Sequence, residues 1–136
     1  MPEALGKVSI APIPDRMGRE LRNELLSRIN PGGSPNEPSH RLSVELHEEQ
    51  QGILVERDNF VSRVNLRIRA KFVLVDLASE KPVLEGQART VAAYNVTSAQ
   101  YANLVAETDA KRRAALVVAE QITDRLAAYF SRKGGA

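Results

Sequence analysis

The clearest pattern in the chain is the alternation of apolar and polar side chains over residues 60–77. Even positions from Val64 to Leu74 are apolar, whereas odd positions from Arg63 to Lys71 are polar or basic. A period of two predicts a β-strand with one buried face. Residues 41–56 and 83–94 alternate in the same way, so three consecutive strands are expected to form a meander. Turns are expected at residues 57–59 and 78–81.

Two details of these strands carry further predictions. The apolar positions change parity after Gln51, which predicts a β-bulge at Gly52. On residues 83–94, one face carries small side chains, which would let a helix approach closely. That face comprises Leu84, Gly86, Ala88, Thr90 and Ala92.

Two other stretches have helical periodicity. Apolar residues four apart, from Met17 to Ile29, predict a helix over residues 16–29 with Asp15 as its N-cap. Its arginines are expected on solvated faces: Arg16, Arg19, Arg22 and Arg28. Residues 98–130 lack proline and glycine and predict a long helix, with Thr97-x-x-Gln100 at capping-box spacing. The side chains expected on its buried stripe are Tyr101, Leu104, Val105, Thr108, Ala115, Val118, Ala119, Ile122, Leu126, Tyr129 and Phe130.

The element order predicts the fold class. Residues 7–14 are expected to form a first strand, residues 30–40 a flexible loop with three prolines and two glycines, and residues 131–136 a tail. The order β-α-β-β-β-α predicts an α+β protein. We expect a two-layer α/β sandwich, with a four-stranded mixed sheet and two helices packed on one face. A chain of 136 residues is expected to form a single domain, residues 1–136.

Composition removes several kinds of function. The chain has no cysteine, which excludes disulfides, thiolate zinc sites and cysteine nucleophiles. It has no phosphate-binding or hydrolase motif, and its histidines, His40 and His47, are predicted to be solvated. We therefore expect no enzyme, no metal and no cofactor. No stretch approaches the length of a membrane span, and no leader is present, so a soluble chain is expected.

One charged cluster requires an interpretation. If residues 60–77 and 83–94 pair about Ser79 and Glu80, Arg89 lies beside Arg69 or Lys71, and basic side chains collect on the face away from the helices. The predicted anion-binding residues are Arg63, Arg67, Arg69, Lys71 and Arg89. A site for phosphate or another anion is one reading; a solubilising, edge-protecting charged face is the other. Nucleic acid is not expected as a partner, because the cluster has no aromatic side chains for stacking.

Motifs spread along the chain resemble the LptE family, the small lipoproteins of the outer-membrane lipopolysaccharide-assembly translocon. The motifs are Ile13-Pro14-Asp15-Arg16, Leu21-Arg22-Asn23-Glu24-Leu25, Arg41-Leu42-x-Val44, Tyr94-Asn95, Tyr101-Ala102, Asp109-Ala110, and Ala119-Glu120-Gln121-Ile122 with Leu126 and Tyr129-Phe130. They cover nearly the whole chain in the family's order.

The resemblance implies a non-catalytic protein. Family members act as plug and assembly partner of a large outer-membrane β-barrel and contact lipopolysaccharide through basic residues. The implied location is the periplasmic side of the outer membrane. The family's precursors carry a signal peptide and a lipid-modified cysteine; this chain has neither, so a trimmed form is expected unless Met1 is the natural start. The family's basic residues do not map one for one, so the five residues above rest on strand geometry.

Two alternatives remain open. One is a periplasmic accessory lipoprotein of another transport or secretion complex, with the same fold but a different partner. The other is a small enzyme with a site at the rim of the sheet. The absence of a nucleophile or metal-ligand set counts against this second alternative.

Overall fold

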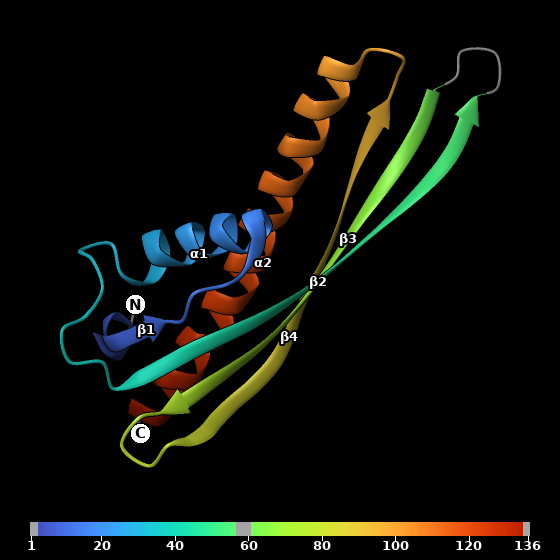
Figure 1. Cartoon of the computed structure of the whole chain (residues 1–136). Helices are drawn as coiled ribbons and strands as arrows, with labels where there is room; N and C mark the ends of the chain where they lie inside the picture. Colours follow the sequence, from blue (N-terminus) through green and yellow to red (C-terminus); the bar gives the residue numbers. More distant parts are fainter. Residues whose placement is uncertain (1–2, 57–60, 135–136) are drawn as a thin grey trace.

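The computed structural model describes residues 3–56 and 61–134 and contains one mixed sheet covered by two helices (Figure 1). The elements are η1 (Glu3–Lys7), β1 (Val8–Ile10), α1 (Asp15–Ile29), β2 (His40–Glu56), β3 (Val61–Asp76), β4 (Lys81–Val96) and α2 (Gln100–Gly134). Strand order follows the sequence, with β1 parallel to β2 and the other pairs antiparallel. The predicted α+β sandwich is confirmed, and the short 3-10 turn η1 is an addition to it.

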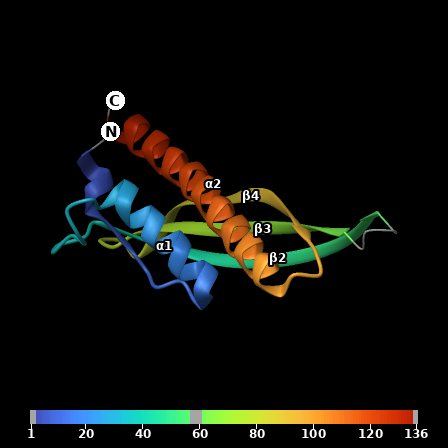
Figure 2. The ribbon, with the colours of Figure 1, turned by 90° about the horizontal axis from the view of Figure 1, so that it is seen from above.

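Both helices lie on the same face of the sheet, and α1 lies beside α2 when the molecule is viewed from above (Figures 1 and 2). The core forms between them because the even positions of β3 face the helices, as predicted. Val64 is only half-buried, since it lies toward the end of the sheet that the helices leave open. The side chains at the centre of the core are Leu21, Leu25, Leu66, Ile68, Phe72, Leu74, Ile122 and Leu126.

The small face of β4 lets α2 approach closely, which confirms the expectation from the sequence. A Cβ atom placed on Gly86 would lie 2.7 Å from Cζ of Phe72 and 2.9 Å from Nη2 of Arg125. The guanidinium carbon of Arg125 lies 5.6 Å from the centre of the Phe72 ring. Ala88 and Ala92 on the same face are buried. The strand therefore has no space for larger side chains where the helix crosses it.

The first turns of α2 differ from the prediction. Tyr101, Leu104 and Val105 are 80%, 59% and 51% exposed, and Thr108 is exposed as well, although the apolar stripe placed all four in the core. The reason is the length of the neighbouring helix. α1 has 15 residues and α2 has 35, so α2 continues well beyond α1 (Figure 1). The part of the stripe from Ala115 to Phe130 lies against the core, as expected.

Both helices begin differently from the sequence prediction. The N-cap of α1 is Pro14 without a side-chain hydrogen bond, and Asp15 is the first helical residue with a φ of 71°. At α2, Asn103 takes the role predicted for Gln100. Its Oδ1 accepts the N–H of Thr97 at 2.8 Å, and its Nδ2 donates to the carbonyl of Thr97 at 2.8 Å. The hydroxyl of Thr97 still accepts the N–H of Ala99 at 3.2 Å, so Thr97 does cap the start of this segment.

The predicted bulge at Gly52 is wrong. Gly52 pairs directly with Val64, and the register first shifts between Leu54 and Glu56. Residues 50–52 are all exposed, so no buried face requires the side chains to keep one parity there. The turn predicted at residues 57–59 lies outside the described residues.

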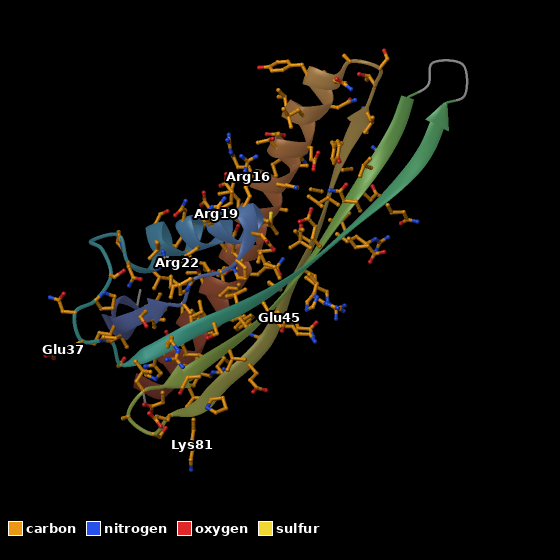
Figure 3. The ribbon with its side chains drawn as sticks, viewed as in Figure 1. Arg16, Arg19, Arg22, Glu37, Glu45 and Lys81 are labelled. Atoms are coloured by element: carbon orange, nitrogen blue, oxygen red, sulfur yellow. The ribbon has the colours of Figure 1, made fainter. Side chains whose placement is uncertain are left out.

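The structure differs from the sequence prediction at three further places. His40 is buried at the start of β2, where its ring centre lies 5.0 Å from that of Phe130 in a T-shaped arrangement, so it is not a solvated loop residue. Arg22 donates to the carbonyl of Ile10 at 3.1 Å and thereby joins α1 to β1, whereas Arg16 and Arg19 project from α1 (Figure 3). Residues 131–134 belong to α2 rather than to a tail, because nothing interrupts the helix before Gly134.

Candidate functional site on the outer face of the sheet

The five predicted anion-binding residues all lie exposed on the face of the sheet opposite the helices. We call them the cationic face; they are Arg63, Arg67, Arg69, Lys71 and Arg89. Four stand at odd positions of β3, and because the even positions are buried under the helices, the odd side chains must point away from them. Arg89 joins them from β4.

Arg69 is at the centre of this face. It is paired directly with Arg89 on β4 and with His47 on β2, so three strands bring nitrogen-bearing side chains together. From the sequence, either Arg69 or Lys71 could lie beside Arg89. The register of β3 with β4 shows that it is Arg69. Like charges opposite one another on a sheet are mildly destabilising. This pair is therefore a local cost to the fold.

A shallow depression of about 710 Å³ lies over this row. It contains Arg67, Arg69 and Arg89, but neither Lys71 nor Arg63. Arg63 is four residues from Arg67 along β3, which corresponds to about 13 Å. The structure thus brings three of the five predicted residues together and leaves two beyond its edges. The complete lining is His47, Glu48, Glu49, Arg67, Ile68, Arg69, Arg89, Thr90 and Val91.

Acidic residues stand opposite two residues of the cationic face, because Glu49 and Glu45 of β2 are in register with Arg67 and Lys71, but no direct ion pair forms between them. None of its five residues forms an ion pair with another described residue. Glu45, which pairs in register with Lys71, instead contacts Nε2 of His47 at 3.3 Å. The Arg89 guanidinium donates to the side-chain oxygen of Gln87 at 3.0 Å, a neutral partner that leaves its charge in place. Arginine forks that lack a carboxylate partner suit phosphate or another anion.

Sequence reasoning missed the contribution of β2 to this depression. His47 and Glu49 occupy odd positions of β2 and pair with Arg69 and Arg67. The alternation of β2 already placed His47 on a polar face. Only the register between β2 and β3 could bring it next to a particular arginine, and the chain pattern did not specify that register. Glu49 adds a carboxylate that would favour a ligand group able to donate as well as accept hydrogen bonds.

The opposite face of the sheet carries a second charged cluster with a different character. Nζ of Lys111 on α2 lies 3.2 Å from Glu107 and 3.5 Å from Glu48 on β2, so its charge is already balanced. Burial alone would lower the pKa of Lys111, but the hydrogen bond to Glu107 and the nearby charge of Glu48 outweigh it and raise the pKa. Burial, together with Glu107, also raises the pKa of the adjacent Tyr94. This cluster holds α2 to the sheet and is not an anion site.

Neither a metal-binding cluster nor a membrane-spanning helix is found among the described residues. Over residues 3–56 and 61–134, no group of three or more histidine or acidic side chains is placed to bind a metal ion. No helix within these residues is both long and apolar enough to cross a membrane.

Three solved structures with the same fold are bacterial proteins described as lipoproteins. A candidate lipoprotein of Caulobacter crescentus is 23% identical, with a TM-score of 0.80 over 94% of this chain and 93% of that chain. A minor lipoprotein of Acinetobacter baumannii is 19% identical, with a TM-score of 0.64 over 90% and 92%. Rare lipoprotein B of Shewanella oneidensis is 11% identical, with a TM-score of 0.58 over 93% and 98%. At these identities the likeness concerns the fold alone.

A match to a protein-family model identifies the family of this chain. The LptE model, described as lipopolysaccharide-assembly, matches residues 5–126, and the chain belongs to this family. LptE is a family of non-enzymatic lipoproteins. A search of curated proteins finds no match.

Proposed function

We propose that this protein is a non-catalytic component of the outer-membrane lipopolysaccharide-assembly translocon. In this role it is the plug and assembly partner of a large β-barrel, and it contacts lipopolysaccharide through the cationic face. The proposed location is the periplasmic side of the outer membrane. Membership of a lipopolysaccharide-assembly family supports the process, and the arginines of β3 and β4 that lack an ion pair within the described residues support the contact.

The observation that carries the lipid contact is the row formed by Arg67, Arg69 and Arg89. Lipopolysaccharide is an anionic glycolipid, and its phosphate oxygens accept hydrogen bonds from guanidinium groups in pairs. Placing Arg69 directly opposite Arg89 lowers the stability of the sheet unless an anion accepts hydrogen bonds from both guanidinium groups. A purely solubilising face would not require Arg69 opposite Arg89, since opposite charges can stand across the strands, as Glu49 stands opposite Arg67.

The barrel partner is supported by the character of the remaining surface. The lumen of an outer-membrane barrel is lined mainly by polar side chains, so a plug needs a polar exterior over a closed core. Arg16 and Arg19 on α1 and the cationic face have this character. Exposed Leu104 on α2, together with Leu116 and Val117 further along it, offers local apolar contacts within that polar surface.

Binding to isolated lipopolysaccharide tests the contact. We expect the variant Arg69→Glu with Arg89→Glu to bind roughly tenfold more weakly, because each exposed charge contact contributes up to about 1 kcal/mol. The matched control is Arg16→Glu with Arg19→Glu, which makes the same charge change on α1 and is expected to bind normally. Affinity should also fall with rising salt.

Equal losses in the two variants would show that net charge, not the cationic face, governs binding. Unchanged binding in both, with unchanged circular dichroism, would leave the charged face as a solubilising feature only.

The partner is tested by crosslinking in envelope membranes. The protein is expressed with a leader and a lipid anchor, and a photoreactive residue replaces Arg69, Leu104 or Val117 in turn. Crosslinks from all three positions to a large, heat-modifiable barrel are expected, because a plug is surrounded by its partner. If the crosslinks reach only soluble periplasmic or inner-membrane proteins, the alternative of an accessory lipoprotein in another transport complex becomes the better account.

A further inference from the structure

Within residues 3–56 and 61–134, the outer edge of β4 has no neighbouring strand, because the sheet order places β4 last. An edge strand of 16 residues presents a row of backbone N–H and C=O groups that another chain can pair with. Proteins usually block such an edge with charges, prolines or a covering element. The question is what blocks β4 between Lys81 and Val96.

Two side chains of α2 bind the backbone of this edge. The side-chain amide of Gln121 accepts the N–H of Arg89 at 3.0 Å and donates to the C=O of Arg89 at 2.9 Å. This pair of bonds is the pattern that a residue of a neighbouring antiparallel strand would make. About two turns toward the start of the helix, Arg113 donates to the C=O of Ala93 at 3.1 Å. Asp109 holds Arg113 in place at 2.9 Å.

Val91 lies midway between these two capped positions. Backbone groups of alternate residues on an edge strand point the same way, so those of Val91 face outward like those of Arg89. Among the described residues, no side chain bonds to the backbone of Val91 in the way that Gln121 and Arg113 bond to its neighbours. The Val91 side chain is 55% exposed. An open depression of about 320 Å³ beside it includes exposed Leu116 and Val117 of α2.

We propose that Gln121 and Arg113 are edge caps that prevent β4 from pairing with β4 of a second copy of this chain. When the caps are withdrawn, the two edges pair antiparallel about a two-fold axis at Val91. The inference concerns self-association and does not depend on the proposed function.

The register of the second copy follows from the side chains that would lie opposite one another. Arg89 and Ala93 lie symmetrically, two residues on either side of Val91, so a two-fold axis at Val91 places Arg89 opposite Ala93 of the other copy. Both capped positions then exchange their side-chain partners for backbone partners. An axis at Arg89 would instead place two Arg89 side chains opposite each other, and like charges in that position are unfavourable. The second copy therefore fits the register centred on Val91 and not the one centred on Arg89.

A single introduced thiol tests this proposal, because the chain has no cysteine. In a Val91→Cys background, the caps are removed by Gln121→Met with Arg113→Met. The matched control is Ala128→Met with Arg112→Met, which changes charge equally at exposed positions of the same helix. At equal protein concentration under mild oxidation, the uncapped protein is expected to form disulfide-linked dimer roughly tenfold faster, because the hydrogen bonds that compete with pairing are gone.

The result is read against a second thiol position. In a Glu37→Cys background, far from the β4 edge, removal of the caps should leave the rate of dimer formation unchanged. Equal rates for capped and uncapped Val91→Cys proteins would overturn the proposal. Equal acceleration at Glu37→Cys would also overturn it, because the association would then be non-specific.

Two measurements keep the proposal open to refutation if the doubly substituted protein does not fold. Amide hydrogen exchange on the unsubstituted protein should protect the N–H of Arg89 more than that of Val91; equal protection would refute the caps. The milder Gln121→Glu change keeps the acceptor for the Arg89 N–H but loses the donor to its carbonyl. It should give an intermediate dimerisation rate, and a rate equal to that of the capped protein would count against the role of Gln121.

Discussion

Replacing Gly86 by alanine tests how tightly β4, β3 and α2 are packed. The new Cβ would lie 2.7 Å from Cζ of Phe72, whereas non-bonded carbon atoms prefer about 3.5–4.0 Å. The ring would have to withdraw by about 1 Å. Phe72 is fully buried, whereas Arg125, the other neighbour of the new Cβ, is exposed and its guanidinium can turn away. The steric cost therefore comes from Phe72, and overpacking of this kind costs about 1–3 kcal/mol.

A control is needed because removing a glycine from a strand also stabilises it, by about 0.5–1 kcal/mol. Gly52 on β2 provides that control, since a Cβ atom there would meet nothing within 4 Å. Denaturant unfolding of Gly86→Ala and Gly52→Ala gives two free energies whose difference isolates the steric term. We expect Gly86→Ala to be less stable than Gly52→Ala by about 1–3 kcal/mol.

A third variant shows whether Phe72 is the cause. Phe72→Leu removes the outer part of the ring, so Gly86→Ala should cost less in that background than in the natural one, a coupling that a double-mutant cycle measures. If Gly86→Ala and Gly52→Ala have equal stability, or if the cycle shows no coupling, the close packing of β4 against Phe72 is refuted.

Three further predictions concern other parts of the molecule. Ile122→Ala should lower the free energy of unfolding by about 2–5 kcal/mol because the side chain is completely buried, and denaturant titration will measure it. Asn103→Ala should cost about 0.5–2 kcal/mol by removing the cap of α2, with the loss seen in thermal unfolding. Since its pKa is raised on folding, Lys111 stabilises the protein fully below its ordinary pKa and loses this effect as pH rises through the folded value. The stability difference between the natural protein and Lys111→Met should therefore shrink in strongly alkaline solution.

Strands and helices could be predicted from the sequence wherever one face is buried. Leu66 and Phe72 on β3 and Ile122 and Leu126 on α2 are apolar at the period of their element, and the structure buries all four. The prediction failed where burial stops. At Gly52 no buried face enforces parity, and at Tyr101 the apolar pattern continues although α1 does not cover that part of the helix. Periodicity reports the geometry of an element, but it does not report the length of its neighbour.

The candidate site could be predicted only to the level of a face. Alternation placed Arg67 and Arg69 on the side away from the helices, and hairpin pairing brought Arg89 near them. The exact partner of Arg89 depended on the register of β3 with β4, which shifts between Leu74 and Val75 and is not visible in the sequence. His47 entered the depression through pairing of β2 with β3, a contact between strands that no pattern within one strand can specify.

The parallel pairing of β1 with β2 has a consequence for the order of folding. Val8 pairs with His40 across the whole of α1 and the following loop, whereas β2, β3 and β4 are joined in sequence by short connections. Closing a long segment costs more chain entropy than closing a hairpin. The meander with α2 is therefore expected to form a folding nucleus, and the first 39 residues to dock on it afterwards. His40 lies where these two parts meet: it contacts Phe130 of α2 within the nucleus, and the first segment docks beside it when Val8 of β1 pairs with it.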